Sequence, residues 1–103
     1  MIPSSLFASL SIPSGQQVSG VAVLPAGVGD LVVAVPACNS GAIFAEASQV
    51  GTASGFKRIA AGVLDCVAQP AGNSLWRFAP PAVYVRFATA AVQVSARTFD
   101  VFV

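Results

Sequence analysis

Apolar and polar residues alternate along short stretches of this chain, and turns rich in proline or glycine separate the stretches. Alternation places successive side chains on opposite faces of a β-strand, whereas an amphipathic helix repeats its apolar residues every three to four positions. No window keeps the helical spacing over a dozen residues. The pattern therefore predicts strands, which we place at 5–12, 17–24, 31–35, 42–48, 56–68, 75–79, 83–87, 92–96 and 99–103.

Two of these segments differ from the others. Residues 31–35 read Leu-Val-Val-Ala-Val and are apolar on both faces, which predicts a central strand. Residues 56–68 admit two interpretations. They form either one strand with a bulge at Gly62, or a short helix from Phe56 to Ala61 followed by a strand. We favour the single strand.

The C-terminal part of the chain carries the clearest alternation. In residues 83–87 the two valines and Phe87 fall on one face, and Tyr84 and Arg86 fall on the other. Apolar and polar residues alternate again in residues 92–96. The Ala-Thr-Ala-Ala stretch between the two segments can close a turn, so we expect them to form a hairpin.

The phase of the apolar positions then slips between Ala96 and Phe99. A slip of one residue moves the side chains of a strand to its other face. We therefore expect a bulge or bend near Arg97 and Thr98, where the chain passes from one sheet to another. The last strand, 99–103, is expected to pair within the chain or with a neighbouring subunit.

The prediction is thus about eight to ten short strands with a turn every eight to twelve residues or so, a spacing typical of an antiparallel sandwich or small barrel. A chain of 103 residues suits one domain with one core. We therefore predict an all-β fold, an antiparallel β-sandwich or small barrel, as a single domain over residues 1–103.

Charge is scarce in this sequence. Charged residues make up 9% of the chain and the formal net charge is +1, whereas ordinary soluble domains carry roughly 25% charged residues. A surface of small neutral residues loses little hydration free energy when another chain covers it, which favours assembly; a monomer with a neutral polar surface is the alternative. The basic residues form no patch that could hold a phosphate backbone, so we expect no nucleic-acid binding.

The most apolar window, residues 18–38, does not resemble a membrane-spanning helix. Such a helix needs about 20 predominantly apolar residues, and here Asp30, two prolines and three glycines interrupt the run. We expect no membrane partner. The first 17 residues also lack the charged and apolar regions of a secretory signal.

No residue pattern in the chain indicates catalysis. Histidine, the commonest general base and metal ligand, is absent. The four carboxylates are isolated in the sequence, and each is expected to pair with an arginine or lie in solvent. Nucleotide-binding loops and nucleophile elbows are also missing. We therefore expect no enzyme, and no catalytic residue, cofactor or metal site.

Cys38 and Cys66 are the two cysteines of the chain. We favour the interpretation that both are small buried hydrophobic residues. A disulfide between them, which would contribute roughly 3 kcal/mol, and a redox role are the alternatives. Two thiols without histidine cannot build a four-ligand zinc site.

A few large or charged side chains near the C-terminus are candidates for contact with a partner. Trp76, Arg77 and Tyr84 could form an exposed platform for a sugar, although burial of Trp76 in the core is the interpretation that we favour. Arg77, Arg86 and Arg97 alternate with apolar residues, and arginine is enriched at protein interfaces. We predict that these five residues contribute to a partner interface; solvated charges on a strand face are the alternative for the arginines.

In overall character the chain resembles the small β-sandwich proteins that decorate or cement bacteriophage capsids. It shares their short Ala/Val/Gly strands, their scarce charge and a Phe-Asp-Val-Phe-Val end that runs in strand to the terminus. The resemblance covers the whole chain and carries over no functional residue. It implies a homo-oligomer, often a trimer, that clamps neighbouring major capsid protein subunits on the capsid exterior. A tail or head–tail structural role, and an extracellular carbohydrate-binding or host-adhesion module, are the alternatives.

Overall fold

A computed structural model describes residues 5–38, 42–50, 55–65 and 74–103. These residues contain eight β-strands and no α-helix, which confirms the all-β prediction. The strands are β1 (Leu6–Ile12), β2 (Ala22–Val23), β3 (Leu31–Val35), β4 (Ala42–Ser48), β5 (Lys57–Asp65), β6 (Ser74–Phe78), β7 (Tyr84–Thr89) and β8 (Arg97–Phe102).

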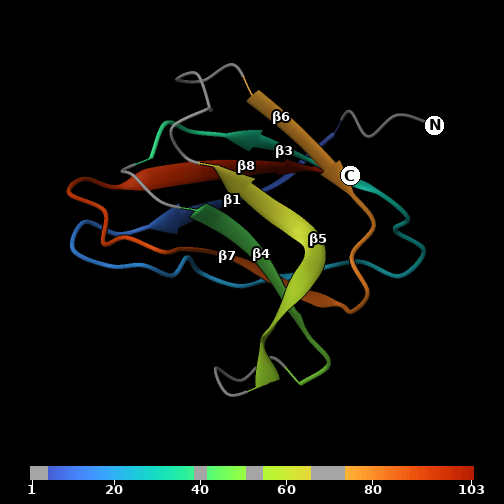
Figure 1. Cartoon of the computed structure of the whole chain (residues 1–103). Helices are drawn as coiled ribbons and strands as arrows, with labels where there is room; N and C mark the ends of the chain where they lie inside the picture. The colour runs from blue at the N-terminus through green and yellow to red at the C-terminus, as the bar shows by residue number, and fades with distance from the viewer. Residues whose placement is uncertain (1–4, 39–41, 51–54, 66–73) are drawn as a thin grey trace.

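The strands form two antiparallel four-stranded sheets that face each other (Figure 1). One sheet has the order β1-β8-β3-β6 and the other has the order β2-β7-β4-β5. The first strand thus pairs with the last, the second with the seventh, the third with the sixth and the fourth with the fifth. This is the strand order of a jelly roll, the two-sheet architecture that contains two Greek keys. The prediction of an antiparallel β-sandwich is confirmed.

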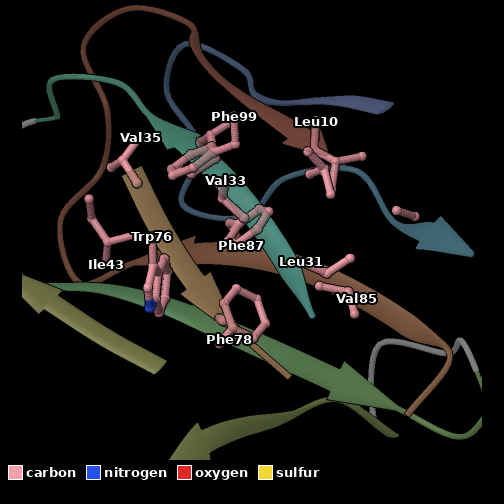
Figure 2. Packing of buried hydrophobic residues seen from close by; sticks show 14 of the residues in the cluster. Leu10, Leu31, Val33, Val35, Ile43, Trp76, Phe78, Val85, Phe87 and Phe99 are labelled. Atoms are coloured by element: carbon pink, nitrogen blue, oxygen red, sulfur yellow. The ribbon is translucent and has the colours of Figure 1, made fainter. Parts of the chain in front are cut away.

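Side chains from both sheets meet in one apolar core (Figure 2). The rings of Phe87 and Phe99 stack across the sandwich with centroids 4.7 Å apart. Burying a phenylalanine or leucine side chain contributes roughly 1.5–3 kcal/mol, so this layer supplies much of the folding free energy. The largest fully buried side chains of the core are Phe87, Phe99, Ile12, Leu31, Ile43, Val33, Val35, Val85 and Val101.

Most predicted strands lie where the alternation placed them. β3 occupies 31–35 and runs between β8 and β6, so the prediction of a central strand is confirmed. β5 is a strand over 57–65, and its register with β4 is irregular between Arg58 and Val63, a stretch that contains Gly62. The bulged-strand interpretation is therefore confirmed for these residues, and the helix is wrong. Residues 66–68 lie outside the described part.

The strand predicted at 17–24 is much shorter than expected. Within this segment, the pairing with β7 is limited to β2 and to an isolated bridge between Val18 and Ala88. Between them, the buried hydroxyl of Ser19 accepts a hydrogen bond from the N–H of Phe87 and donates one to the carbonyl of Gly20, each at 2.8 Å. A side chain thus replaces part of the regular ladder, and the segment follows β7 without forming one continuous strand.

The predicted hairpin over 83–96 is wrong. β7 pairs with β2 and β4, and the next strand, β8, belongs to the opposite sheet. Residues 90–96 cross between the sheets instead of forming a strand. Their alternation is inverted, because Gln93 is fully buried whereas Val92 and Val94 are 51% and 75% exposed.

The crossing at 90–96 lies beside the loop between β1 and β2, where Figure 1 draws the blue and the orange-red loops next to each other. The N–H of Gly15 donates to the carbonyl of Gln93, and the N–H of Gln93 donates to the carbonyl of Gln16. Gly15 adopts a positive φ of 81°, which glycine tolerates at little steric cost. These bonds fix the place where the chain changes sheets, a few residues before the predicted bend at Arg97 and Thr98.

The last strand is completely internal. β8 lies between β1 and β3, and its inward residues Phe99 and Val101 are buried. The C-terminal strand therefore pairs within the chain, with β1 along its length and with β3 from Asp100 to Phe102. Its position gives no reason to expect a neighbouring subunit at this strand.

Candidate partner interface

The structure does not bring the five predicted interface residues together on one surface. Trp76 and Arg77 lie on β6 in the first sheet, Tyr84 and Arg86 lie on β7 in the second, and Arg97 begins β8. Their role in contact with a partner stays a prediction. Each residue can, however, be assigned an intramolecular environment.

Trp76 points into the core. It is 7% exposed, and its ring centroid lies 5.0 Å from that of Phe78 and 6.1 Å from that of Phe87. The favoured interpretation of Trp76 as a core residue is confirmed. A ring packed in this way offers no free face for a sugar, and Arg77 points to the opposite side of β6.

Arg86 is held inside a network on the outer face of the second sheet. It lies opposite Glu46 in the register of β4 and β7, and its Nε is 2.7 Å from the Glu46 carboxylate. Both side chains are mostly buried, at 16% and 13% exposure. The Arg86 guanidinium also lies 4.2 Å from the ring centroid of Phe56, and Arg58 stacks on Phe44 at 3.7 Å. Arg86 therefore fits an internal structural role better than a contact with solvent or a partner.

Arg77 is the predicted arginine that lies open to solvent. Its Nη2 is 2.7 Å from the Asp30 carboxylate, and the two side chains are 53% and 39% exposed. Arg97 is half-buried and donates from Nε to the side-chain oxygen of Gln93 at 3.2 Å. Arg77 and Asp30 neutralise each other, so this face of the molecule carries an ion pair and little net charge.

Sequence reasoning missed a set of apolar residues beside Tyr84. In residues 21–24, which contain β2, Ala22 and Leu24 are buried, whereas Val21 and Val23 are 42% and 57% exposed on the opposite side. Val23 pairs in register with the half-buried Tyr84. We call Val21, Val23 and Tyr84 the β2 surface. The alternation of 17–24 contained this signal, but the sequence did not show that the neighbouring edge of the sheet is open.

A cleft of about 220 Å³ lies next to the β2 surface. Two loops form its walls, the one after β2 and the one before β7, and no lining side chain carries a polar group. Both loops were predicted as turns from their prolines, yet only the fold places them side by side. The lining residues are Leu24, Pro25, Ala26, Gly27, Val28, Pro80, Pro81, Ala82 and Val83.

A second cleft, of about 320 Å³, opens in the first sheet between the end of β3 and the start of β8. The paired register of these strands stops at Ala34 and Asp100, and β3 is followed directly by Pro36, which has no N–H to donate. The walls carry two charged side chains, Arg97 and Asp100. The Asp100 carboxylate accepts a hydrogen bond from the Ser9 hydroxyl at 2.7 Å, so a contact within the chain explains the carboxylate of this cleft.

Among the described residues, no three His, Cys, Asp or Glu side chains gather as metal ligands, and no helix has the length and apolarity of a membrane span. Cys38 is half-buried, packs against the core and donates its thiol to the Pro36 carbonyl at 3.7 Å, while Cys66 lies outside the described residues.

No family model, curated protein or solved structure matches the chain. Function is therefore inferred from strand order and surface chemistry.

Proposed function

We propose that the protein is a non-enzymatic structural component of a virion, a cement or decoration protein that oligomerises and binds across major capsid protein subunits. The observation that carries the proposal is the strand order β1-β8-β3-β6 and β2-β7-β4-β5. Jelly rolls of this kind recur in viral capsid domains and in lectins. Because one fold hosts several functions, the surface must distinguish between them.

The surface favours protein contact over ligand recognition. Two ion pairs, Arg77–Asp30 and Arg86–Glu46, neutralise charge within the molecule. A partner that covers such a surface removes few unpaired charges from water, and each Å² of apolar area that it buries contributes about 25 cal/mol. The lectin-like alternative needs an exposed aromatic face, and the tryptophan that suggested one is buried.

The β2 surface is the region that we assign to the contact with the capsid. Val21 and Val23 are exposed, and Tyr84 supplies an aromatic ring with a polar end, the residue type most enriched at interfaces together with Trp and Arg. The adjoining cleft has apolar walls and accepts a projecting apolar side chain of the partner. The protein would stabilise a shell by adding buried area at the junctions of subunits.

The proposal is tested on particles assembled from a genome that encodes the chain. Purified virions should contain the protein on their outer surface, and particles that lack it should release their genome at a lower temperature. Adding the purified protein back should restore the wild-type release temperature. Virions that contain no copy of the chain would contradict the proposal, and a location in the tail would select the tail or head–tail alternative.

A pair of matched variants locates the contact. Val23→Asp puts a carboxylate into the β2 surface, whereas Val94→Asp puts the same charge on the crossing at the other end of β7, where Val94 is 75% exposed. Burying an unpaired charge is costly, so Val23→Asp should weaken binding to depleted particles by at least about tenfold. Val94→Asp should bind as the wild type does. Equal binding of the two variants would remove the β2 surface from the proposal.

A further inference from the structure

Three of the four sheet edges in the described structure carry features that discourage further strand pairing. β1 has a break in register between Leu6 and Ala8, β2 is two residues long, and β5 begins with Lys57 and Arg58 and has an irregular register. Bulges, short strands and basic residues are the devices by which proteins protect sheet edges.

The fourth edge, β6, has neither a bulge nor a length of only two residues, and its one basic residue, Arg77, is paired with Asp30 within the chain. Its five residues pair with β3 in an unbroken register, and the strand contains no proline or glycine. Leu75, on its outer face, is 73% exposed. No other described strand pairs with its outer edge. A regular and partly apolar edge is a template for an added strand.

The hydrogen bonds near the C-terminus reveal which backbone groups of β8 face β3. Ser5 and Val103 exchange both of their backbone hydrogen bonds, so Val103 faces β1. Successive residues of a strand direct their backbone groups to opposite sides, which turns Phe102 and Asp100 toward β3. The 2.7 Å bond between the side chains of Ser9 and Asp100 agrees with this assignment, because side chains approach most closely in pairs whose backbones do not bond.

The same alternation, carried across β3, orients β6. The β3 residue opposite Asp100 bonds to β8, so its neighbour Val33 bonds to β6, where it lies opposite Trp76. The backbone N–H and C=O groups of Trp76 therefore bond to β3. Leu75 and Arg77, on either side of it, direct their N–H and C=O groups to the free edge.

We propose that this free edge pairs antiparallel with β6 of a second copy of the chain, around a two-fold axis at Trp76. In this register Leu75 lies opposite Arg77 of the second copy, and by symmetry the reverse pair forms. Each pair exchanges two backbone hydrogen bonds. The two sheets β1-β8-β3-β6 would then join into one continuous sheet across the dimer.

Charge favours a second copy as the occupant. Arg77 is the charged residue of β6 and is neutralised within its own chain by Asp30 at 2.7 Å. The two-fold register sets Arg77 against a leucine and not against another arginine, so no like charges face each other directly. The Leu75 side chain can then cover the aliphatic stem of that arginine.

This contact would be the interface of the oligomer in the proposed function, and the inference rests on the proposed function in this respect. Its test uses the purified protein alone, without virions. A protein that dimerises through β6 and never enters a virion would refute the proposed function and leave the pairing intact. A virion protein that stays monomeric in solution would refute the pairing.

Amide hydrogen exchange of the wild-type protein, followed by NMR at rising concentration, tests the pairing directly. The amides of Leu75 and Arg77 should become protected by at least about tenfold as the protein associates. The amides of Trp76 and Phe78, which bond to β3, should be protected at every concentration. Absence of concentration-dependent protection at 75 and 77, or its appearance at another edge, overturns the proposal.

Two substitutions at one position separate backbone pairing from side-chain contact. Leu75→Pro removes an N–H that points to the free edge, and with it one bond from each of the two pairs, while the bonds to β3 remain. Leu75→Thr removes the apolar side chain but keeps the N–H. Light scattering should show that the proline variant is monomeric and that the threonine variant still dimerises, with unchanged Trp76 fluorescence as the control for folding. Equal loss of association in both variants overturns strand pairing.

Discussion

Two adjacent segments with the same alternating pattern bury opposite faces in this fold. In β7, Val85 and Phe87 are buried, with an exposed fraction of 1% or less, as the alternation predicts. In the crossing that follows, Val92 and Val94 are exposed and the polar residue between them is fully buried. Alternation therefore identifies the two faces of a segment but does not decide which face is covered.

The difference lies in what surrounds each segment. β7 has a strand on each side and the opposite sheet beneath it, so its inward face must be apolar. The crossing lies at the end of the sandwich, where Gln93 replaces apolar packing with hydrogen bonds. Its amide donates to the Thr89 hydroxyl at 3.2 Å and the Ala91 carbonyl at 3.0 Å, and its oxygen accepts from Arg97. A buried polar group is stable in this position because its partners are present.

The largest effect is expected at the centre of β7. Phe87→Ala removes a ring that stacks on Phe99 and contacts Trp76, and should lower the free energy of unfolding by about 3–5 kcal/mol. Urea denaturation followed by circular dichroism measures this loss. Val94→Ala is the matched truncation in the crossing and should change stability by less than about 0.5 kcal/mol. Comparable losses in the two variants would show that the crossing is packed as a strand.

A smaller but clear loss is expected for the inverted position. Gln93→Ala leaves a cavity and removes the side-chain bonds of a fully buried amide, which should cost about 2–3 kcal/mol in the same assay. Gln16→Ala, at an exposed position of the neighbouring loop, is the control and should cost less than about 0.5 kcal/mol. If Val92→Ala destabilises the protein more than Gln93→Ala does, the valines and not the amide anchor the crossing.

The smallest effects are expected at the two ion pairs on the outer faces, of which Glu46–Arg86 holds β7 and Asp30–Arg77 involves β6 of the other sheet. Glu46→Gln weakens the mostly buried pair with Arg86, and we expect a loss of about 1–2 kcal/mol. Asp30→Asn weakens the exposed pair with Arg77 and should cost less than about 1 kcal/mol. Salt should reduce the second effect more than the first, because exposed pairs are screened. Equal losses at low and high salt would show that burial does not distinguish the two pairs.

The candidate site was less accessible to sequence reasoning than the fold. The burial of Trp76 was predicted from the large share of buried area that tryptophan and phenylalanine supply in a small sandwich. The carboxylate partners of the arginines could not be predicted, because Arg86 and Arg77 pair with carboxylates that lie 40 and 47 residues away in the chain. The β2 surface was hidden for a related reason, since the sequence does not show that β2 is an edge strand of the described sheet and that Val21 and Val23 are exposed there.

The sequence by itself determined that the protein is built of short antiparallel strands, because alternation and turn residues act within a few positions of each other. It also determined most strand positions, among them β3 and β4 with the predicted ends. Only the tertiary structure decided which strands pair. The crossing at 90–96 sends the chain to the other sheet through backbone bonds to the loop at Gly15 and Gln16. Such bonds join residues far apart in the sequence, and the local pattern of apolar and polar residues does not predict them.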